Sequence, residues 1–180
     1  MKRVCVFCGS RTGMKPDYAE AARHLGRVLA SRGLELVYGG GHVGLMGIVA
    51  DSVLSAGGRV LGVIPQALKD KELAHTGTTE LYVVESMHQR KALMNDLSDG
   101  FIALPGGFGT GDELFEIITW RQLDIHAKPI GILNVMGFFD LMLHWVNKMV
   151  DEGFVKPEYR DLICVSTDPE ELLLRIGAIG

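Results

Sequence analysis

Short hydrophobic runs alternate with amphipathic stretches along the whole chain. Most of the runs are apolar at consecutive positions, which is typical of parallel strands covered on both faces. We expect strands at residues 3–8, 35–38, 59–64, 80–84, 100–104, 129–133 and 162–165. We expect helices at residues 18–31, 45–56, 88–97, 110–125, 138–152 and 169–176. This alternation predicts an α/β fold, a doubly wound parallel sheet with helices on both faces in a single domain over residues 1–180.

A functional site is expected at one edge of this sheet. Ligands of such folds bind beyond the carboxyl ends of the strands. Glycine-rich segments follow three of the predicted strands, at residues 8–10, 39–44 and 105–110. The longest segment without a periodic pattern, residues 65–79, exceeds the usual connection length and is a candidate active-site loop.

Composition narrows the class of protein. The chain has 180 residues, of which 47% are hydrophobic, enough for the core of one domain. The net charge is −4 and the basic residues are scattered, which argues against a large nucleic-acid surface but leaves a small anionic ligand open. No apolar run reaches the roughly 20 residues that span a bilayer. The first residues also lack the features of a signal peptide, so we expect a cytoplasmic protein without membrane association.

The cysteines are too few for a disulfide scaffold. Cys5 and Cys8 form a C-x-x-C pattern, and Cys164 stands alone. Because an odd separation within a strand places two side chains on opposite faces, we expect buried thiols rather than a redox pair.

The three glycine-rich segments are candidate phosphate-binding loops. Glycine lets the backbone approach a ligand, and a following helix N-terminus presents free N–H groups to an anion. The third segment fits best, because Thr110 adds a hydroxyl group at the helix start. A tight strand-to-helix turn without a ligand is the alternative interpretation of each segment.

Two nucleotide-binding fingerprints fail on this sequence. Residues 39–44 match G-x-G-x-x-G, but the next strand ends at Ile64 and Pro65 without the carboxylate that binds ribose, so a dehydrogenase is not expected. No G-x-x-x-x-G-K-[ST] pattern is present, which excludes a P-loop nucleotide hydrolase. The histidines are dispersed, so neither a metal site nor a Ser-His-Asp triad is predicted.

Charged residues flank the glycine-rich segments. Ser86 is a plausible helix cap, and Arg90 and Lys91 follow it near the carboxyl edge. A solvated basic face is the alternative interpretation, but the nearby glycine segments favour anion binding. Asp112 and Glu116 are explained by the dipole of a first helical turn. For Glu113, the neighbouring glycines and Arg90 favour a catalytic role.

Two stretches carry a resemblance to a known family. Residues 105–113, P-G-G-F-G-T-G-D-E, resemble the P-G-G-x-G-T-x-x-E signature of the Lonely Guy proteins. Residues 87–91, M-H-Q-R-K, are similar to their second signature. These proteins are cytokinin-activating phosphoribohydrolases, often mislabelled as lysine decarboxylases. The resemblance covers almost the whole chain, although Arg11 stands where many relatives have a small hydroxyl residue.

The resemblance implies a Rossmann-like homodimer without a cofactor. It implies hydrolysis of the N-glycosidic bond of nucleoside 5′-monophosphates, AMP or N6-modified adenine nucleotides, to the base and ribose 5-phosphate. The family's catalytic arginine and glutamate fall on Arg90 and Glu113. The positions expected to bind substrate are Gly9, Ser10, Gly40, Gly41, Glu72, Met87, Arg90, Lys91, Gly106, Gly107, Phe108, Gly109, Thr110, Gly111, Asp112, Glu113 and Thr119.

Two other functions stay open at this point. A non-catalytic carrier of a nucleotide or pterin cofactor can share the fold, because a phosphate-binding loop alone does not prove hydrolysis. A pyridoxal-dependent decarboxylase needs a Schiff-base lysine and a partner for the pyridinium ring, and no such pair is identifiable.

Overall fold

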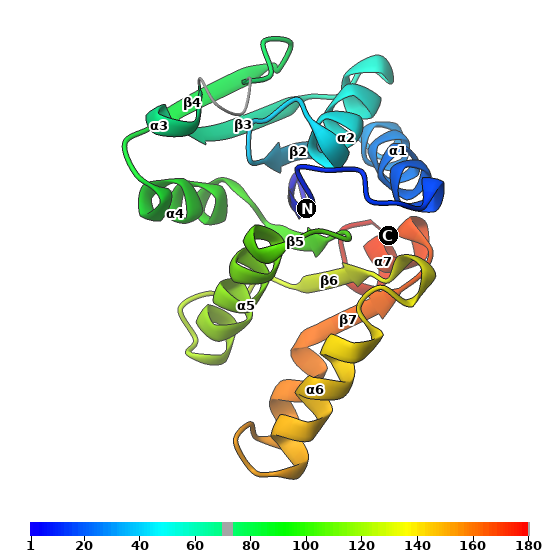
Figure 1. The fold of residues 1–180 in the computed structure, drawn as a ribbon, viewed down its shortest axis with the longest axis vertical. Helices are drawn as coiled ribbons and strands as arrows, with labels where there is room; N and C mark the ends of the chain where they lie inside the picture. Colours follow the sequence, from blue (N-terminus) through cyan, green and yellow to red (C-terminus); the bar gives the residue numbers. More distant parts are fainter. Residues whose placement is uncertain (70–73, 180) are drawn as a thin grey trace.

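The computed structural model describes residues 1–69 and 74–179. Its strands form one parallel sheet of seven strands in the order β4-β3-β2-β1-β5-β6-β7 (Figure 1). The strands are β1 Arg3–Phe7, β2 Glu35–Tyr38, β3 Val60–Pro65, β4 Glu80–Val84, β5 Gly100–Ala103, β6 Ile130–Leu133 and β7 Ile163–Ser166. The predicted Rossmann-like α/β fold is confirmed, and all seven predicted strands are present within one residue of their expected ends.

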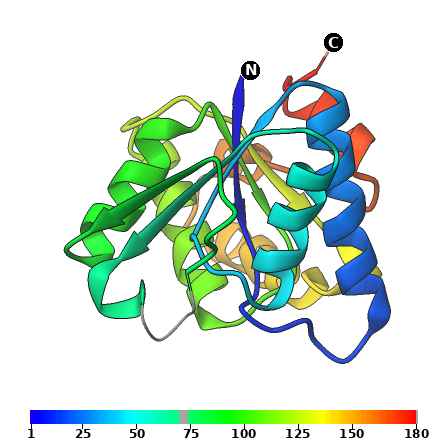
Figure 2. The ribbon, with the colours of Figure 1, turned by 90° about the horizontal axis from the view of Figure 1, so that it is seen from above.

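Helices cover both faces of the sheet (Figure 2). The α-helices are α1 Pro16–Ser31, α2 Gly44–Ser55, α3 Gln66–Lys69, α4 Met87–Leu97, α5 Phe108–Gln122, α6 Asp140–Asp151 and α7 Pro169–Arg175. Two 3₁₀-helices, η1 Val135–Gly137 and η2 Pro157–Leu162, flank α6. Helices α1, α2 and α7 pack on one face, whereas α4, α5 and α6 pack on the other.

The chain reverses its direction of progress across the sheet at β1. This strand pairs with β2 on one side and β5 on the other, so the loops after β1 and β5 meet at the switch point. In the register, Phe7 lies opposite Ala103, which brings the ends of β1 and β5 to the same level. The crevice that such a reversal creates is the expected ligand site of this architecture.

The core consists of two clusters, one on each side of the sheet. Cys5 belongs to the cluster under α4 and α5, and Cys8 belongs to the cluster under α1 and α2. Both thiols are buried and free. The prediction that they face opposite sides of the sheet is therefore confirmed, and burial raises the pKa of each thiol.

Two differences from the predicted elements bear on the site. Helix α5 begins at Phe108 instead of Thr110, which places the residues after Gly107 directly in the first turn. The segment 65–79 is not wholly irregular, because Pro65 ends β3 and the short helix α3 follows it. Four residues of good helix propensity form α3, too few for a periodic pattern to reveal it. No helix within the described part of the chain is long and apolar enough to cross a membrane.

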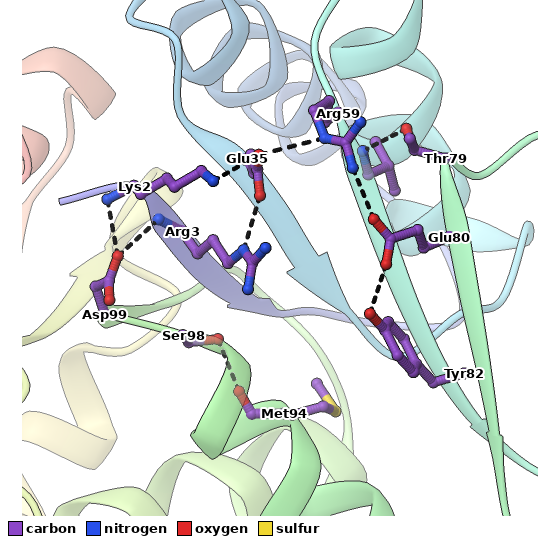
Figure 3. A network of polar contacts seen from close by, with 11 residues as sticks. Lys2, Arg3, Glu35, Arg59, Thr79, Glu80, Tyr82, Met94, Ser98 and Asp99 are labelled. Atoms are coloured by element: carbon purple, nitrogen blue, oxygen red, sulfur yellow. Dashed lines mark hydrogen bonds and ion pairs between the residues drawn. The ribbon is translucent and has the colours of Figure 1, made fainter.

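A polar network joins the strands at their amino ends (Figure 3). Glu35, the first residue of β2, accepts a hydrogen bond of 2.7 Å from Arg3 Nε and lies 3.2 Å from Arg59 Nε. Arg59 in turn pairs with Glu80 at 2.6 Å. The Asp99 carboxylate accepts hydrogen bonds from the backbone N–H groups of residues 2 and 3. These contacts tie together the starts of β1 to β5.

Candidate active site

The loops after β1 and β5 are bonded directly to each other. Gly9 donates from its backbone N–H to the Pro105 carbonyl oxygen at 3.0 Å, and its own carbonyl accepts from Leu45 at 2.9 Å. A Cβ atom on Gly106 would lie 2.1 Å from Thr110 Oγ1 and 2.8 Å from the nitrogen of Gly9. Glycine is therefore required at position 106, because the two loops approach too closely for any side chain.

The N-terminus of α5 opens beside this contact. Gly107, Phe108 and Gly109 are exposed, and a Cβ atom on either glycine would meet nothing within 4 Å. Thr110 is buried, with its hydroxyl oxygen against Gly106. The free N–H groups and partial positive charge of this helix end suit a phosphate group. The structure thus brings together the first and third glycine-rich segments.

The second glycine-rich segment is arranged differently. Gly40 and Gly41 are buried, the Gly40 carbonyl accepts a 3.0 Å hydrogen bond from the His75 N–H, and Gly41 forms a β-bridge with Ala74. A Cβ atom on Gly39 would lie 2.0 Å from Arg90 Nη2. The backbone of Gly40 and Gly41 is thus bonded to Ala74 and His75, and the role of these two glycines in substrate binding stays a prediction.

Arg90 is held in the interior by the start of α4. Ser86 caps this helix by accepting from the Gln89 N–H at 3.2 Å, as the sequence predicts. Arg90 is 7% exposed, and its Nη2 group donates to the Gly39 carbonyl at 3.2 Å. Met87, in the first turn, places its sulfur 3.8 Å from Nη1. The Arg90 Nε–H has no partner among the described residues, so a buried donor is left for a ligand.

Glu113 lies beside Arg90. Its Oε1 atom is 3.9 Å from Arg90 Nη2, and its side chain is 11% exposed. Burial raises the pKa of Glu113 to about 7, the Arg90 charge opposes this rise, and Asp112 adds to it. A carboxyl group with this pKa exchanges protons near neutral pH, as a general acid or base requires.

Lys91 forms ion pairs with two carboxylates, which balance its positive charge. Its Nζ atom lies 3.2 Å from Asp112 and 3.0 Å from Glu116. Burial alone would lower the pKa of Lys91, but these two bonds outweigh it and raise the pKa. Because α5 starts two residues earlier than expected, Asp112 lies beyond the first turn. The explanation of Asp112 and Glu116 by the helix dipole was wrong, since both carboxylates pair with Lys91.

A cavity of about 610 Å³ lies at the N-terminus of α5. Its lining includes Ser10, Arg11, Gly106, Gly107 and three aromatic residues, Tyr18, Phe108 and Phe138. The rings of Tyr18 and Phe138 meet edge to face with centroids 5.8 Å apart. Arg90 and Glu113 are not among the residues that line this cavity.

Sequence reasoning missed Tyr18 and Phe138. A usable signal was present, because each lies near the start of a helix that follows a strand. Such positions fall at the carboxyl edge of a parallel sheet. Aromatic residues there are therefore candidates for lining a ligand cavity.

One predicted site residue lies apart from the others, and another falls outside the described part of the chain. Thr119 is exposed, and its hydroxyl group donates to the Phe115 carbonyl of its own helix at 2.8 Å. At 1.5 Å per residue, it lies roughly 13 Å along α5 from Thr110. Glu72 lies outside the described residues. Within those residues, no group of three or more histidine, cysteine, aspartate or glutamate side chains could hold a metal ion.

Solved structures and known families resemble this chain at different levels. The fold is similar to that of the molybdenum cofactor carrier protein MCP from Chlamydomonas reinhardtii, with a TM-score of 0.75 and 19% identity over 98% of this chain and 96% of that one. Identity this low shows the fold alone. A family model described as "Possible lysine decarboxylase" matches residues 46–176.

Curated relatives are much more similar in sequence. The chain is 50% identical over 177 residues to the cytokinin riboside 5′-monophosphate phosphoribohydrolase LOG5 of Arabidopsis thaliana, covering 98% of this chain and 78% of LOG5. It is 51% identical over 175 residues to LOG7 of the same organism, with 97% and 81% covered. These identities confirm the resemblance carried by residues 87–91 and 105–113. The chain therefore belongs to the Lonely Guy family of cytokinin riboside 5′-monophosphate phosphoribohydrolases.

Proposed function

We propose that this protein hydrolyses the N-glycosidic bond of nucleoside 5′-monophosphates, releasing the base and ribose 5-phosphate. AMP and N6-modified adenine nucleotides are the proposed substrates. The observation that carries the proposal is the buried pair of Arg90 and Glu113, 3.9 Å apart, beside the open N-terminus of α5. The named activity of relatives at about half identity supports the same reaction.

The phosphate group is proposed to bind at the start of α5. Open space lies where a Cβ atom would stand on Gly107 and Gly109, and the contact between Gly9 and residue 105 holds the loop. Binding energy from this remote group aligns the ribose carbon with the catalytic residues. Nucleosides without the phosphate are therefore expected to be poor substrates.

Glu113 is proposed to act on the ribose. Breaking the N-glycosidic bond develops positive charge on the sugar and negative charge on the leaving base. An ionised Glu113 stabilises the sugar cation and accepts a proton from the attacking water. Its pKa of about 7 means that a substantial fraction is ionised at neutral pH.

Arg90 is proposed to act by its charge. A guanidinium group does not release its proton in the physiological range, so Arg90 stabilises and positions charge instead of donating a proton. Its unpartnered Nε–H is the group available to substrate, while Nη2 is held by the Gly39 carbonyl.

The deciding experiment incubates the purified protein with AMP, N6-isopentenyl-AMP and adenosine and separates the products by chromatography. We expect free base and ribose 5-phosphate from the two monophosphates and little base from adenosine. Arg90→Ala and Glu113→Ala should each abolish turnover with the fold intact. Comparable turnover of adenosine and AMP would refute the role of the phosphate loop, and no base from any substrate would refute hydrolysis.

A non-catalytic carrier is the second candidate function, because a phosphate-binding loop on this fold does not by itself prove hydrolysis. It predicts tight ligand binding without base release in the same assay. A pyridoxal-dependent decarboxylase is disfavoured by Lys91, because a Schiff base needs an uncharged amine. The two carboxylates paired with Lys91 instead keep it protonated.

We further propose that the protein is a homodimer. Large apolar side chains are exposed on α6 and on the turns that follow α5 and α6, at Leu123, Ile125, Leu141, Trp145 and Phe154. Exposed apolar side chains in such numbers favour an interaction surface. Light scattering during gel filtration should give twice the chain mass, and Leu141→Asp should shift it toward the monomer; a wild-type monomer contradicts the proposal.

A further inference from the structure

We propose that His75, together with Asp51, is a positioning residue for Arg90. The pair fixes the glycine-rich segment 39–41, whose backbone carbonyl at Gly39 holds the guanidinium group. This inference rests on the proposed function, because its kinetic consequence is a change in turnover. Neither His75 nor Asp51 has been given a part in the reaction above, and the candidate cavity does not include them.

The His75 side chain is bonded through both ring nitrogens. The Gly77 N–H donates to Nδ1 at 3.1 Å, so Nδ1 is an acceptor and the ring proton lies on Nε2. Nε2 is 2.9 Å from Asp51 Oδ1 and therefore donates to this carboxylate. The ring is buried, and its orientation is fixed at both ends, by helix α2 and by its own turn.

The His75 backbone carries this fixed position to the glycine-rich segment. The His75 N–H donates to the Gly40 carbonyl at 3.0 Å, and the preceding Ala74 forms an antiparallel bridge with Gly41. The Thr78 hydroxyl donates to the His75 carbonyl at 3.2 Å. Residues 74–79, which we call the brace, thus connect Asp51 on α2 to the glycine-rich loop after β2.

The glycine-rich segment needs such a brace. Gly40 has a φ of +75°, a conformation that only glycine adopts easily, and glycine has little intrinsic stiffness. Gly39 has no room for a side chain, since a Cβ atom would lie 2.0 Å from Arg90 Nη2. The segment therefore cannot be held by side chains of its own.

The position of the segment sets the position of Arg90. Gly39 supplies the carbonyl that accepts from Arg90 Nη2 at 3.2 Å, one residue before the Gly40 carbonyl that His75 holds. Displacing catalytic groups by about 1 Å can lower turnover by about a hundredfold. Loosening the brace should accordingly lower kcat. The proposed phosphate-binding loop before α5 is held by the contact between Gly9 and Pro105, which the brace does not touch, so KM should change little.

The exposure of Asp51 distinguishes positioning from stability. Its side chain is 67% exposed, and an ion pair with one exposed partner contributes little to the stability of a fold. A purely structural role therefore predicts small effects of Asp51→Ala on both melting temperature and turnover. The positioning role predicts that turnover falls while the melting temperature is nearly unchanged.

The experiment compares kcat and KM for AMP in wild-type protein, His75→Ala, Asp51→Ala, the double variant and His75→Gln. We expect kcat to fall about tenfold in each alanine variant and no further in the double variant, with KM within about twofold of wild type. His75→Gln, whose amide nitrogen can still donate to Asp51, should recover most of the activity. His24→Ala and Asp17→Ala, on α1, are the matched controls and should behave as wild type.

A second measurement is independent of turnover. Amide hydrogen exchange of residues 39–41 should become faster in His75→Ala and Asp51→Ala, because the brace no longer protects the segment. Unchanged kcat in both variants, a KM effect alone, or unchanged exchange would overturn the inference. Absence of base release by the wild-type protein would instead refute the proposed function, and the exchange measurement would still test the brace.

Discussion

A buried glutamate lies at each edge of the sheet, and the pKa of the two carboxyl groups is shifted in opposite directions. At the amino edge, the Glu35 side chain is 9% exposed, and burial alone would raise its pKa. The hydrogen bond from Arg3 and the charges of Lys2 and Arg59 outweigh burial, so the pKa of Glu35 falls below its usual value. At the carboxyl edge, burial dominates and the pKa of Glu113 rises to about 7.

The difference lies in how completely the partners satisfy each carboxylate. Arg3 contacts Glu35 at 2.7 Å, whereas Arg90 stays 3.9 Å from Glu113, beyond hydrogen-bond distance. Arg90 also keeps an unpartnered Nε–H. Buried polar groups are normally satisfied, and a concentration of unsatisfied ones marks a place where a ligand completes the structure. The amino edge is built for stability, and the carboxyl edge is left incomplete.

The largest expected effect comes from neutralising the carboxyl-edge glutamate. Glu113→Gln keeps the shape but removes the base, so turnover of AMP should fall by about 10²- to 10⁴-fold. Stability should be unchanged or slightly higher, because a poorly solvated carboxylate is lost. Base release and thermal melting measure the two effects. Near-normal turnover would show that the incomplete edge is not catalytic.

The pH dependence of turnover follows from the same group. The raised pKa of Glu113 means that its contribution to stability is present below its ordinary value of 4.5 and is lost as pH rises through about 7. Catalysis by the ionised form runs the other way, so kcat should rise over this window. Measuring kcat at saturating AMP from about pH 5 to about pH 9 tests this sign. A kcat that falls with rising pH would mean that Glu113 works as an acid.

Substitutions of two adjacent glycines at the carboxyl edge should separate effects on stability from effects on substrate binding. Gly106→Ala forces a methyl group against Thr110 and Gly9 and should lower the free energy of unfolding by about 1–3 kcal/mol. Gly107→Ala meets only open space, so stability should be unchanged while KM for AMP rises about tenfold where the methyl group displaces phosphate. Equal effects of the two variants on KM and on melting would contradict the placement of the phosphate.

The smallest effect is expected at the amino edge. Glu35→Gln removes the charge that Arg3 and Arg59 share, and should lower the free energy of unfolding by about 1 kcal/mol at neutral pH. Because the pKa of Glu35 is lowered, this stabilisation is present above its ordinary value of 4.5 and is lost as pH falls below it. Turnover should stay at the wild-type level, measured beside urea unfolding. A loss of turnover in Glu35→Gln would contradict the view that the amino edge contributes to stability alone.

The strands and long helices were predictable because their hydrophobic pattern is local. Each strand is a short apolar run buried on both faces, and its period does not depend on distant contacts. The start of α5 and the short helix α3 were missed, since each depends on one turn of backbone instead of a periodic stretch. The joining of Arg90 and Glu113 at one site was expected from the resemblance, and their catalytic roles remain predictions.

The sequence by itself determined the fold class, the edge of the sheet that carries the glycine-rich segments, and the family. It could not decide which glycines stay open to a ligand, because burial is set by segments far apart in the chain. Ala74 and His75 bond to the backbone of Gly40 and Gly41, whereas no described residue would meet a Cβ atom on Gly107. Nor could the sequence decide that Lys91 forms close ion pairs with two carboxylates while Glu113 has no cation of the described residues within hydrogen-bond distance. Only the packing of α4 against α5 sets these distances, and a pKa depends on distance and burial more than on residue type.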